Sequence, residues 1–380
     1  MLVVYCIAHT GKSLLWAAGD LLTLYILVSR YGMAPALAGA LFLAGLTASA
    51  LADLAVGAWL TRRPRDAAPL AAGALCVAGV AFPLTMLSAP LGAGMVLVAA
   101  LLFRIAYAGC DVPHNALMGR LADDPARATA LSRGRTLGTG IASIVAAGCI
   151  GLIGDIGIGP MLWGIGAAAT LLGLAMVPLL TLFPLAPEGR SPRSGFRPGL
   201  PATFLFASVI GIVALGALGK AMLHFSDMPA PMQGVSMLVI LIVGRTASAF
   251  VPLPMSSTRQ GLTLLAAIYA VSAVVPVLFI VPEAQSAAPL LLGVAMGLSN
   301  LVGWALLSML ARDARDYGFY TMASKLALGA AGLALAGGLG GLPMFTAHGF
   351  RLFASGIASA CIVAAVLCLT CRPRRDLHAA

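Results

Sequence analysis

The sequence predicts an all-α polytopic membrane protein. Of its 380 residues, 60% are hydrophobic and only 9% are charged, whereas soluble domains contain roughly 25% charged residues. So few charges cannot solvate a water-exposed surface, and disordered chains are poor in apolar residues. The apolar residues are grouped in runs of about 20 residues or more, the length that a membrane-spanning helix needs. A soluble enzyme and a disordered protein are therefore excluded.

Twelve such runs account for most of the chain, and Pro or Gly marks many of the joins. The first run is too long for a cleavable signal peptide and contains Asp20, so we expect it to remain as a span. Each run is interpreted as one spanning helix, which leaves almost nothing for an extramembrane domain. The runs cover residues 3–29, 35–60, 68–88, 91–115, 135–155, 160–184, 202–224, 233–255, 260–281, 287–310, 319–342 and 349–370.

Basic residues set the orientation of these spans. Alternate connections carry sixteen arginines on one side, but only Arg30 and Arg351 on the other. Because positive charges gather in cytoplasmic loops, we expect both termini in the cytoplasm of a multi-pass protein of the plasma (bacterial inner) membrane. The net charge of +10 is thus spread over loops and does not form a nucleic-acid-binding patch. The expected partners are a small-molecule substrate and the lipid bilayer, with the chain a monomer.

One long polar connection divides the chain. Residues 187–198 (PEGRSPRSGFRP) are basic and rich in Pro and Ser, with six runs on each side. The sequence therefore predicts an N-terminal six-helix half (1–186), a cytoplasmic linker (187–199) and a C-terminal six-helix half (200–380). This is the layout of major facilitator transporters, whose halves rock about a site near the membrane midplane.

A few ionisable residues lie inside the runs, where charges are costly and mark an ion or substrate path. Helical spacing places several of them on polar or aromatic stripes. Trp16, Tyr107 and Trp304 are expected to stack on a substrate ring. Interhelical hydrogen bonding is the alternative role for these polar groups. The intramembrane charges are Lys12, Arg104, Lys220, Arg245, Lys325, Asp20, Asp53 and Asp111. The candidate substrate-binding residues are Ser13, Trp16, Asp20, Tyr107, Asp111, Asn115, Arg135, Asn300 and Trp304.

Several segments resemble the glycoside–pentoside–hexuronide (melibiose permease-like) cation symporters of the major facilitator superfamily. The strongest resemblance lies in residues 111–127 (DVPHNALMGRLADDPAR) and 131–135 (LSRGR). Gly11-Lys12, residues 31–39 (YGMAPALAG) and residues 53–57 (DLAVG) are also similar to the family. Residues 304–318 with Lys325 resemble its span 10–11 region.

The resemblance implies solute transport that is often coupled to Na⁺ or H⁺. In the family, the acid matching Asp111 and the arginine matching Arg135 help to hold the sugar. The acid matching Asp53 contributes to the cation site, and the lysine matching Lys325 lies close to it. The family's sugar permeases often carry an acid directly after Gly-Lys and a second acid one turn before Asp53.

Here these two positions are Ser13 and Ser49. Losing carboxylates weakens a Na⁺ site, so we expect Ser49, Asp53 and Lys325 to serve H⁺ coupling. Transport without any ion coupling is the alternative, and no metal or organic cofactor is expected.

The sequence thus predicts a secondary active symporter for a small polar solute such as a sugar or glycoside. The alternatives are transport of an amphiphile (a lysolipid, drug or hydrophobic metabolite) and a non-transporting membrane scaffold or sensor. No enzyme is expected, because no metalloprotease, hydrolase or P-loop motif occurs. A cytoplasmic gate is expected from Arg62, Asp123, Arg127 and Asp313, although these charges would also suit solvated loops.

Overall fold

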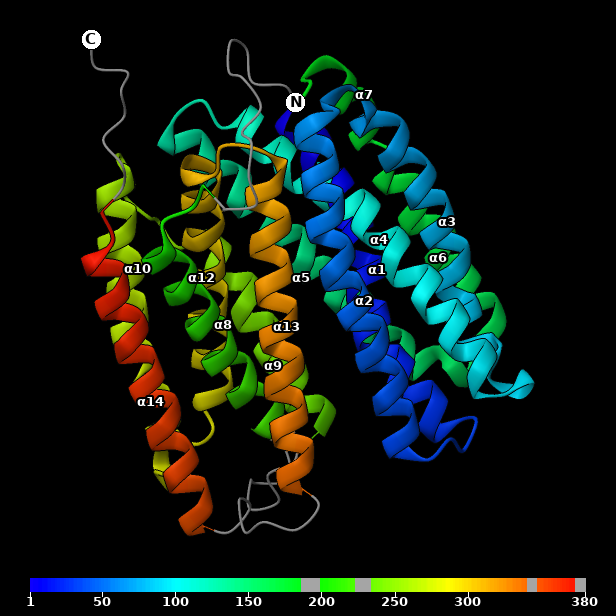
Figure 1. The fold of residues 1–380 in the computed structure, drawn as a ribbon. Coiled ribbons are helices and arrows are strands. Elements are labelled where there is room, and N and C mark those ends of the chain that lie inside the picture. The colour runs from blue at the N-terminus through cyan, green and yellow to red at the C-terminus, as the bar shows by residue number, and fades with distance from the viewer. Residues whose placement is uncertain (186–198, 223–233, 340–346, 373–380) are drawn as a thin grey trace. The chain divides into compact units, whose positions relative to one another are not determined.

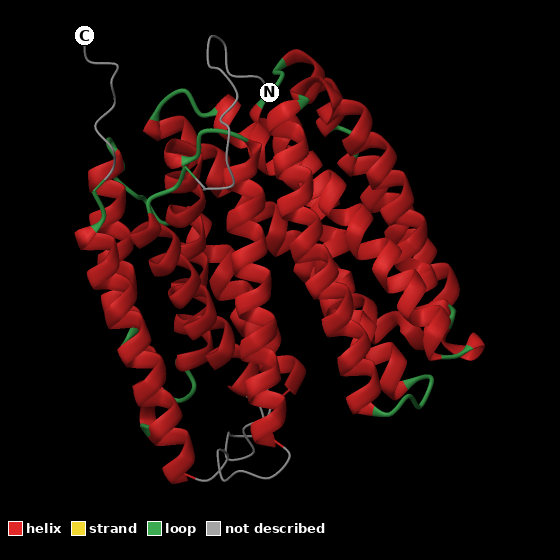
Figure 2. Ribbon diagram, in the orientation of Figure 1, coloured by secondary structure: helices red, strands yellow, loops and turns green. Residues whose placement is uncertain are grey.

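The structure is a computed structural model that describes residues 1–185, 199–222, 234–339 and 347–372. Within these ranges every regular element is a helix and no strand occurs (Figure 2). The predicted all-α architecture is therefore confirmed. The predicted linker, apart from Gly199, lies outside the described residues.

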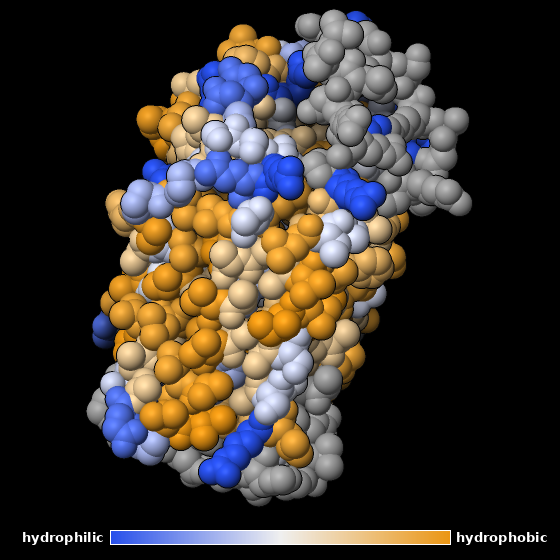
Figure 3. Space-filling view, turned by 90° about the vertical axis from the view of Figure 1, so that its left-hand side faces the viewer, coloured by the Kyte–Doolittle hydropathy of each residue, from blue (hydrophilic) through white to orange (hydrophobic). Residues whose placement is uncertain are grey.

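Ten helices in the described part of the chain are long and apolar enough to cross a membrane. The predicted run 233–255 corresponds to the shorter helix α9 (Gly234–Ala247), and the run 319–342 to α13 (Ala314–Leu339). On the face shown in Figure 3, hydrophobic residues cover a broad middle band, and hydrophilic residues gather toward the two ends. This pattern is expected where a lipid bilayer surrounds the middle of the spans. The chain is a multi-pass membrane protein.

The helices form two compact units, which do not coincide with the two sequence halves (Figure 1). Unit 1 consists of the described residues of Met1–Leu121, Leu137–Pro198 and Asp313–Gly329. In it, α3 packs against α4 and α6, α2 against α4, and α1 against α6. Its complete helices are α1 (Leu2–Ser29), α2 (Pro35–Arg62), α3 (Ala67–Leu87), α4 (Ala93–Leu121), α6 (Ile158–Gly173) and α7 (Met176–Leu182).

Unit 2 consists of the described residues of Ala122–Thr136, Gly199–Arg312 and Ala330–Ala380. In it, α12 packs against α8, α9 and α10, and α14 packs against α8 and α10. Helices α5 (Pro125–Ile156) and α13 each contribute one part to each unit. The complete helices of unit 2 are α8 (Ala202–Met222), α9, α10 (Thr258–Ser272), α11 (Val275–Leu278), α12 (Ala288–Leu310) and α14 (Ala347–Thr370).

Several helices extend beyond the apolar runs that predicted them. Helix α5 begins at Pro125, not at residue 135, and α4 continues to Leu121, not to residue 115. Asp124 stabilises the start of α5, because its carboxylate accepts a hydrogen bond from the backbone N–H of Arg127 at 2.8 Å. Pro125 fits this start, since its missing N–H would lack an intrahelical partner there. Arg133, expected in the connection before the fifth span, therefore lies inside α5.

Glycines allow close approach of helices within each unit, as small residues do in other membrane bundles. In unit 1, a Cβ atom on Gly166 of α6 would collide with the carbonyl oxygen of Gly79 on α3. In unit 2, a Cβ on Gly293 of α12 would collide with the carbonyl oxygen of Leu241 on α9. Because the opposing atoms belong to backbone, rotation of a side chain cannot relieve these collisions.

We expect Gly166→Leu to lower the thermal stability of the detergent-solubilised protein, because overpacking typically costs about 1–3 kcal/mol. Gly164→Leu is the matched control, since Gly164 lies on the same helix and nothing lies within 4 Å of a Cβ placed there. Thermal unfolding of the two variants and the wild type measures the effect. Equal unfolding temperatures for the two variants would contradict the close α3–α6 packing.

Candidate functional site

Four charged side chains meet in the interior of unit 1. They are Lys12 on α1, Asp53 on α2, Asp111 on α4 and Lys325 on α13. Their exposed fractions are 3%, 0%, 6% and 6%, respectively. We call these four residues the charge network. Its two positive and two negative charges balance, which limits the cost of burying them at membrane depth.

Each carboxylate of the charge network faces a lysine. The Nζ atom of Lys325 lies 2.6 Å from Oδ2 of Asp53 and 3.7 Å from Oδ2 of Asp111. The same ammonium donates a hydrogen bond to the hydroxyl of Ser49 at 3.0 Å. Lys12 forms an ion pair with Oδ1 of Asp111. Asp111 therefore interacts with both lysines. Because Lys325 contacts both aspartates, a change of charge at one aspartate alters the interactions of the other.

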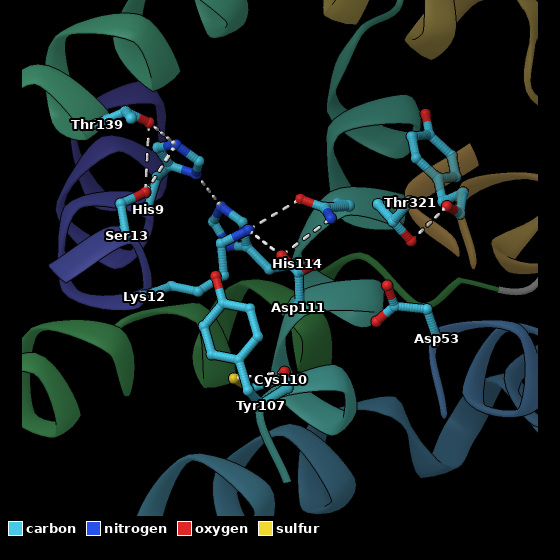
Figure 4. Close-up of polar contacts among 12 residues, drawn as sticks. His9, Lys12, Ser13, Asp53, Tyr107, Cys110, Asp111, His114, Thr139 and Thr321 are labelled. Carbon is cyan, nitrogen blue, oxygen red and sulfur yellow. Dashed lines mark hydrogen bonds and ion pairs between the residues drawn. The ribbon is translucent and has the colours of Figure 1, made fainter. Parts of the chain in front are cut away.

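Asn115 completes this group on α4, one turn after Asp111. Figure 4 shows Asp111 and Lys12. Its side-chain oxygen accepts a hydrogen bond from Nζ of Lys12 at 3.0 Å, and its amide donates to Oδ1 of Asp111 at 3.0 Å. Charged hydrogen-bonding groups of this kind are suited to binding hydroxyl groups. The predicted substrate residues Asp111 and Asn115 thus form one hydrogen-bonding cluster with Lys12.

Two aromatic rings lie beside the charge network. The rings of Trp16 and Tyr107 are 5.5 Å apart between centroids. Nζ of Lys325 lies 5.2 Å from the Trp16 centroid and 5.5 Å from the Tyr107 centroid, within the range of cation–π attraction. The guanidinium carbon of Arg104 also lies 5.0 Å from the Trp16 centroid. The predicted aromatic residues of unit 1 therefore flank both the network and the buried arginine.

Three of the other predicted substrate residues lie in unit 2. The guanidinium carbon of Arg135 lies 3.7 Å from the centroid of the Trp304 ring. The indole N–H of Trp304 donates to the side-chain oxygen of Asn300 at 3.1 Å. Ser132 fixes the start of α5 on α12, because its hydroxyl donates to the carbonyl oxygen of Leu301 at 2.6 Å. The structure thus brings Arg135, Asn300 and Trp304 together.

Two further predicted substrate residues, both in unit 1, also lie outside the charge network. The hydroxyl of Ser13 lies 3.1 Å from Nε2 of His9 and contacts that ring. Asp20 is exposed on α1, eight residues beyond Lys12, which corresponds to about 12 Å along the helix. Sequence reasoning did not select Lys12 as a binding residue, and it did not select His114. The spacing of His114, three residues after Asp111, was the available signal, because it places both on one face of α4.

The predicted gate residues make local contacts. Asp123 and Arg127 form an exposed ion pair one helical turn apart, at 2.8 Å. Asp313 stabilises the start of α13, because its carboxylate accepts hydrogen bonds from the backbone N–H groups of Arg315 and Asp316 at 3.0 and 3.3 Å. Arg62 is the exposed last residue of α2. Their role in a gate stays a prediction. Among the described residues, no group of three or more His, Cys, Asp or Glu side chains is placed to hold a metal ion.

The structure is similar to solved structures of several transporters. It matches the human organic anion transporter MFSD10 (TETRAN) with a TM-score of 0.66, at 14% identity over 97% of this chain and 98% of the other. It matches an outward-facing bacterial homologue of the iron transporter ferroportin with a TM-score of 0.67, at 12% identity over 97% and 98%. It matches the proton:xylose symporter XylE of the major facilitator superfamily with a TM-score of 0.60, at 12% identity over 97% and 94%.

These likenesses show that the chain has the major facilitator fold. No protein-family model and no curated protein matches the sequence. The narrower resemblance to the melibiose permease-like symporters therefore stays a prediction. The three structural neighbours are named for an organic anion, iron and xylose, so the fold by itself does not select a substrate.

Proposed function

We propose that this chain is a secondary active transporter that moves a small polar solute, such as a sugar or glycoside, by alternating access with proton coupling. The observation that carries this proposal is the charge network buried in unit 1. A membrane scaffold has no need for two buried lysine–aspartate pairs, whereas charged groups at this depth commonly lie on substrate and ion paths. The hydrogen-bonding cluster of Asp111, Asn115 and Lys12 offers donors and acceptors to hydroxyl groups. Trp16 and Tyr107 offer ring surfaces beside it.

The contacts of Asp53 favour H⁺ over Na⁺ as the coupling ion. A sodium site needs several free oxygen ligands, but the ammonium of Lys325 already lies 2.6 Å from Asp53 Oδ2 and 3.0 Å from Ser49 Oγ. Protonation of Asp53 would remove the negative charge that holds Lys325. The lysine would then pair more strongly with Asp111, which lies 3.7 Å away. Protonation of one acid thus changes the group that we propose to bind the solute.

Uptake into proteoliposomes tests this proposal. The panel contains labelled fucose, xylose, other glycosides and a lysolipid, with H⁺ and Na⁺ gradients imposed separately. We expect uptake of a hydroxyl-rich solute driven by a proton gradient. Asp111→Asn is expected to lower binding about tenfold or more, because losing a hydrogen bond to a charged group costs about 1.5–3 kcal/mol.

Asp155→Asn is the matched control, since Asp155 is an exposed acid near the end of α5. It should leave uptake unchanged. Uptake driven by Na⁺ at fixed pH would contradict the proton coupling. Uptake of the lysolipid alone would show that the substrate is an amphiphile and not a sugar. The assigned site would be contradicted by two results together. The wild type would transport no solute on the panel, and the Asp111→Asn variant would bind every solute as the wild type does.

A further inference from the structure

Arg104 is a buried cation of unit 1 that does not belong to the charge network. It lies on α4, seven residues before Asp111, and is 3% exposed. Within the described part of the chain it forms no ion pair. Its Nη1 atom is buried and has no hydrogen-bond partner there. Such a group is costly, because buried N–H donors need acceptors and a buried charge needs a counter-charge.

The buried charges of unit 1 do not balance without a further negative charge. Among the described residues of this unit, four buried cations face three buried carboxylates. One positive charge therefore remains, and an unbalanced buried charge is destabilising. The cations are Lys12, Arg104, Arg315 and Lys325, and the carboxylates are Asp53, Asp111 and Asp316.

Aromatic rings surround the guanidinium of Arg104. Its central carbon lies 5.0 Å from the ring centroid of Trp16, 5.1 Å from that of Phe42 and 5.3 Å from that of Phe103. Gly45 of α2 makes room for the side chain, since a Cβ placed there would lie 3.2 Å from Cγ of Arg104. Cation–π attraction stabilises the charge in part. It supplies neither a counter-charge nor a strong acceptor for the N–H groups.

Arg104 borders a small cavity that is partly open. The cavity has a volume of about 10 Å³, roughly what one water-sized group needs. Its other lining residues include Leu27 near the end of α1, Thr85 near the end of α3 and Val96 near the start of α4. These ends belong to the predicted outer side of the membrane. The cavity thus lies between Arg104 and the outer ends of the helices.

A second free donor borders the same cavity. Thr23 of α1 is 5% exposed, and its hydroxyl makes no hydrogen bond to any described residue. Thr85 also borders the cavity, but its hydroxyl proton is donated to the carbonyl oxygen of Ala81 at 3.0 Å. No carboxylate occurs among the described residues that line the cavity. The cavity therefore combines two unused donors with a positive charge, which is the chemistry of an anion site.

Asp20 does not fill this role. Its negative charge attracts Arg104, but the two side chains form no ion pair and Asp20 does not line the cavity. Asp20 is exposed, so water and salt screen its charge. An anion in the cavity would be partly shielded from water, where its attraction to the guanidinium is stronger.

We propose that Arg104 and Thr23 form a binding site for one small monovalent anion, either a chloride ion or the carboxylate of a small organic acid. The guanidinium neutralises the charge and donates from Nη1, and the hydroxyl of Thr23 donates a second hydrogen bond. A lipid headgroup fits poorly, because Arg104 lies eleven residues after Ala93, where α4 begins, or about 17 Å along the helix. The site depends neither on the identity of the transported solute nor on proton coupling.

Thermal unfolding of the solubilised full chain tests the site. The salts are potassium chloride, potassium acetate and the potassium salt of MES, a sulfonate too bulky for the cavity, all at equal ionic strength. A ligand that binds only the folded state raises the unfolding temperature, so chloride or acetate should raise it relative to MES and the rise should saturate. In Arg104→Gln the same rise should need at least about tenfold more anion, because a hydrogen bond to a charged group is lost.

Matched variants separate this site from general salt effects. Arg351→Gln is the control for Arg104→Gln, since Arg351 is an exposed arginine of α14 on the same predicted side, and it should respond as the wild type does. Thr23→Val keeps the shape of the side chain and should also weaken the anion about tenfold. It tests the site even if Arg104→Gln does not fold. Thr85→Val is its control, because the hydroxyl proton of Thr85 is already bonded within α3.

Line broadening of the ³⁵Cl NMR signal by the protein, with acetate as competitor, identifies the anion. Broadening that Arg104→Gln removes and acetate leaves unchanged would assign the site to chloride. Broadening that acetate reverses would assign it to both anions. An acetate-dependent stabilisation without chloride broadening would assign it to carboxylates. Each of these three results supports the site.

Three other results would overturn the proposal. The first is a wild type that responds to neither chloride nor acetate. The second is an equal response in the wild type, Arg104→Gln and Thr23→Val, which would place anion binding elsewhere. The third is a response that appears only in Asp20→Asn, which would mean that Asp20 is already the counter-charge of Arg104. None of these measurements requires transport, so failure of the proposed transport activity would leave the test of the anion site intact.

Discussion

Lys325→Met is expected to abolish transport and to destabilise the protein by about 3–5 kcal/mol, the usual cost of removing one partner of a buried ion pair. The ammonium of Lys325 is the group 2.6 Å from Oδ2 of Asp53, and Asp53 is fully buried. Without the lysine, Asp53 must either stay as an unbalanced buried charge or take up a proton. In both cases Asp53 loses the lysine through which it is coupled to Asp111.

The double variant Asp53→Asn/Lys325→Met separates stability from function. It removes both charges, so the network becomes neutral again and most of the lost thermal stability is expected to return. Transport is not expected to return, because the acid that we propose to bind the proton and its lysine partner are both absent. Lys220→Met is the matched control, since Lys220 is an exposed lysine at the end of α8.

Thermal unfolding and proteoliposome uptake are the two measurements. A single variant as stable as the wild type, or a double variant no more stable than the single, would contradict the charge balance described for unit 1.

Apolar runs predicted where the helices lie but not where they end. An apolar run covers only the part of a helix whose side chains face lipid or the protein interior. The helix itself continues wherever its backbone hydrogen bonds can form. The residues that begin α5 and α13 are Asp124-Pro125 and Asp313, which are start signals readable from the sequence. Using these signals would have placed Arg133 inside α5.

Helical spacing predicted which residues share a face of one helix, but not which face of another helix they meet. It grouped Asp111 with Asn115 on α4, and these two residues hydrogen-bond at 3.0 Å. The partners of Asp111 on other helices depend on tertiary packing. The pairing of Lys12 with Asp111 and the contact of His9 with His114 join residues about one hundred positions apart. Spacing within a single helix contains no information about such contacts.

Gly57→Leu is expected to block transport by preventing a close contact between α2 and α13. A Cβ atom on Gly57 would lie 2.7 Å from the carbonyl oxygen of Ala314 and 3.0 Å from the Cα of Arg315. On the facing helix, a Cβ on Gly318 would collide with the carbonyl oxygen of Asp53. The backbone N–H of Arg315 also donates to the hydroxyl of Thr61 at 3.1 Å. This crossing therefore needs glycine on both helices.

The contact joins helices from the two predicted sequence halves. Under the proposed alternating access, rocking of those halves would break and re-form it in each cycle. Overpacking typically costs about 1–3 kcal/mol, which lowers the population of the state in which α2 and α13 are in contact by about fivefold to 150-fold. A cysteine introduced as Thr321→Cys, one turn beyond Gly318 in a background without native cysteines, reports on the crossing. Gly57→Leu is expected to speed its alkylation by an impermeant maleimide in inside-out vesicles.

Gly39→Leu is the matched control on α2, because nothing lies within 4 Å of a Cβ placed there. It should leave both transport and the alkylation rate unchanged. If Gly57→Leu abolishes transport without changing alkylation, the variant has damaged the site near Asp53 and not the crossing. If it transports normally, α2 and α13 do not need to approach this closely in any step of the cycle. The two measurements together therefore distinguish a conformational role of the glycines from a role in supporting the charge network.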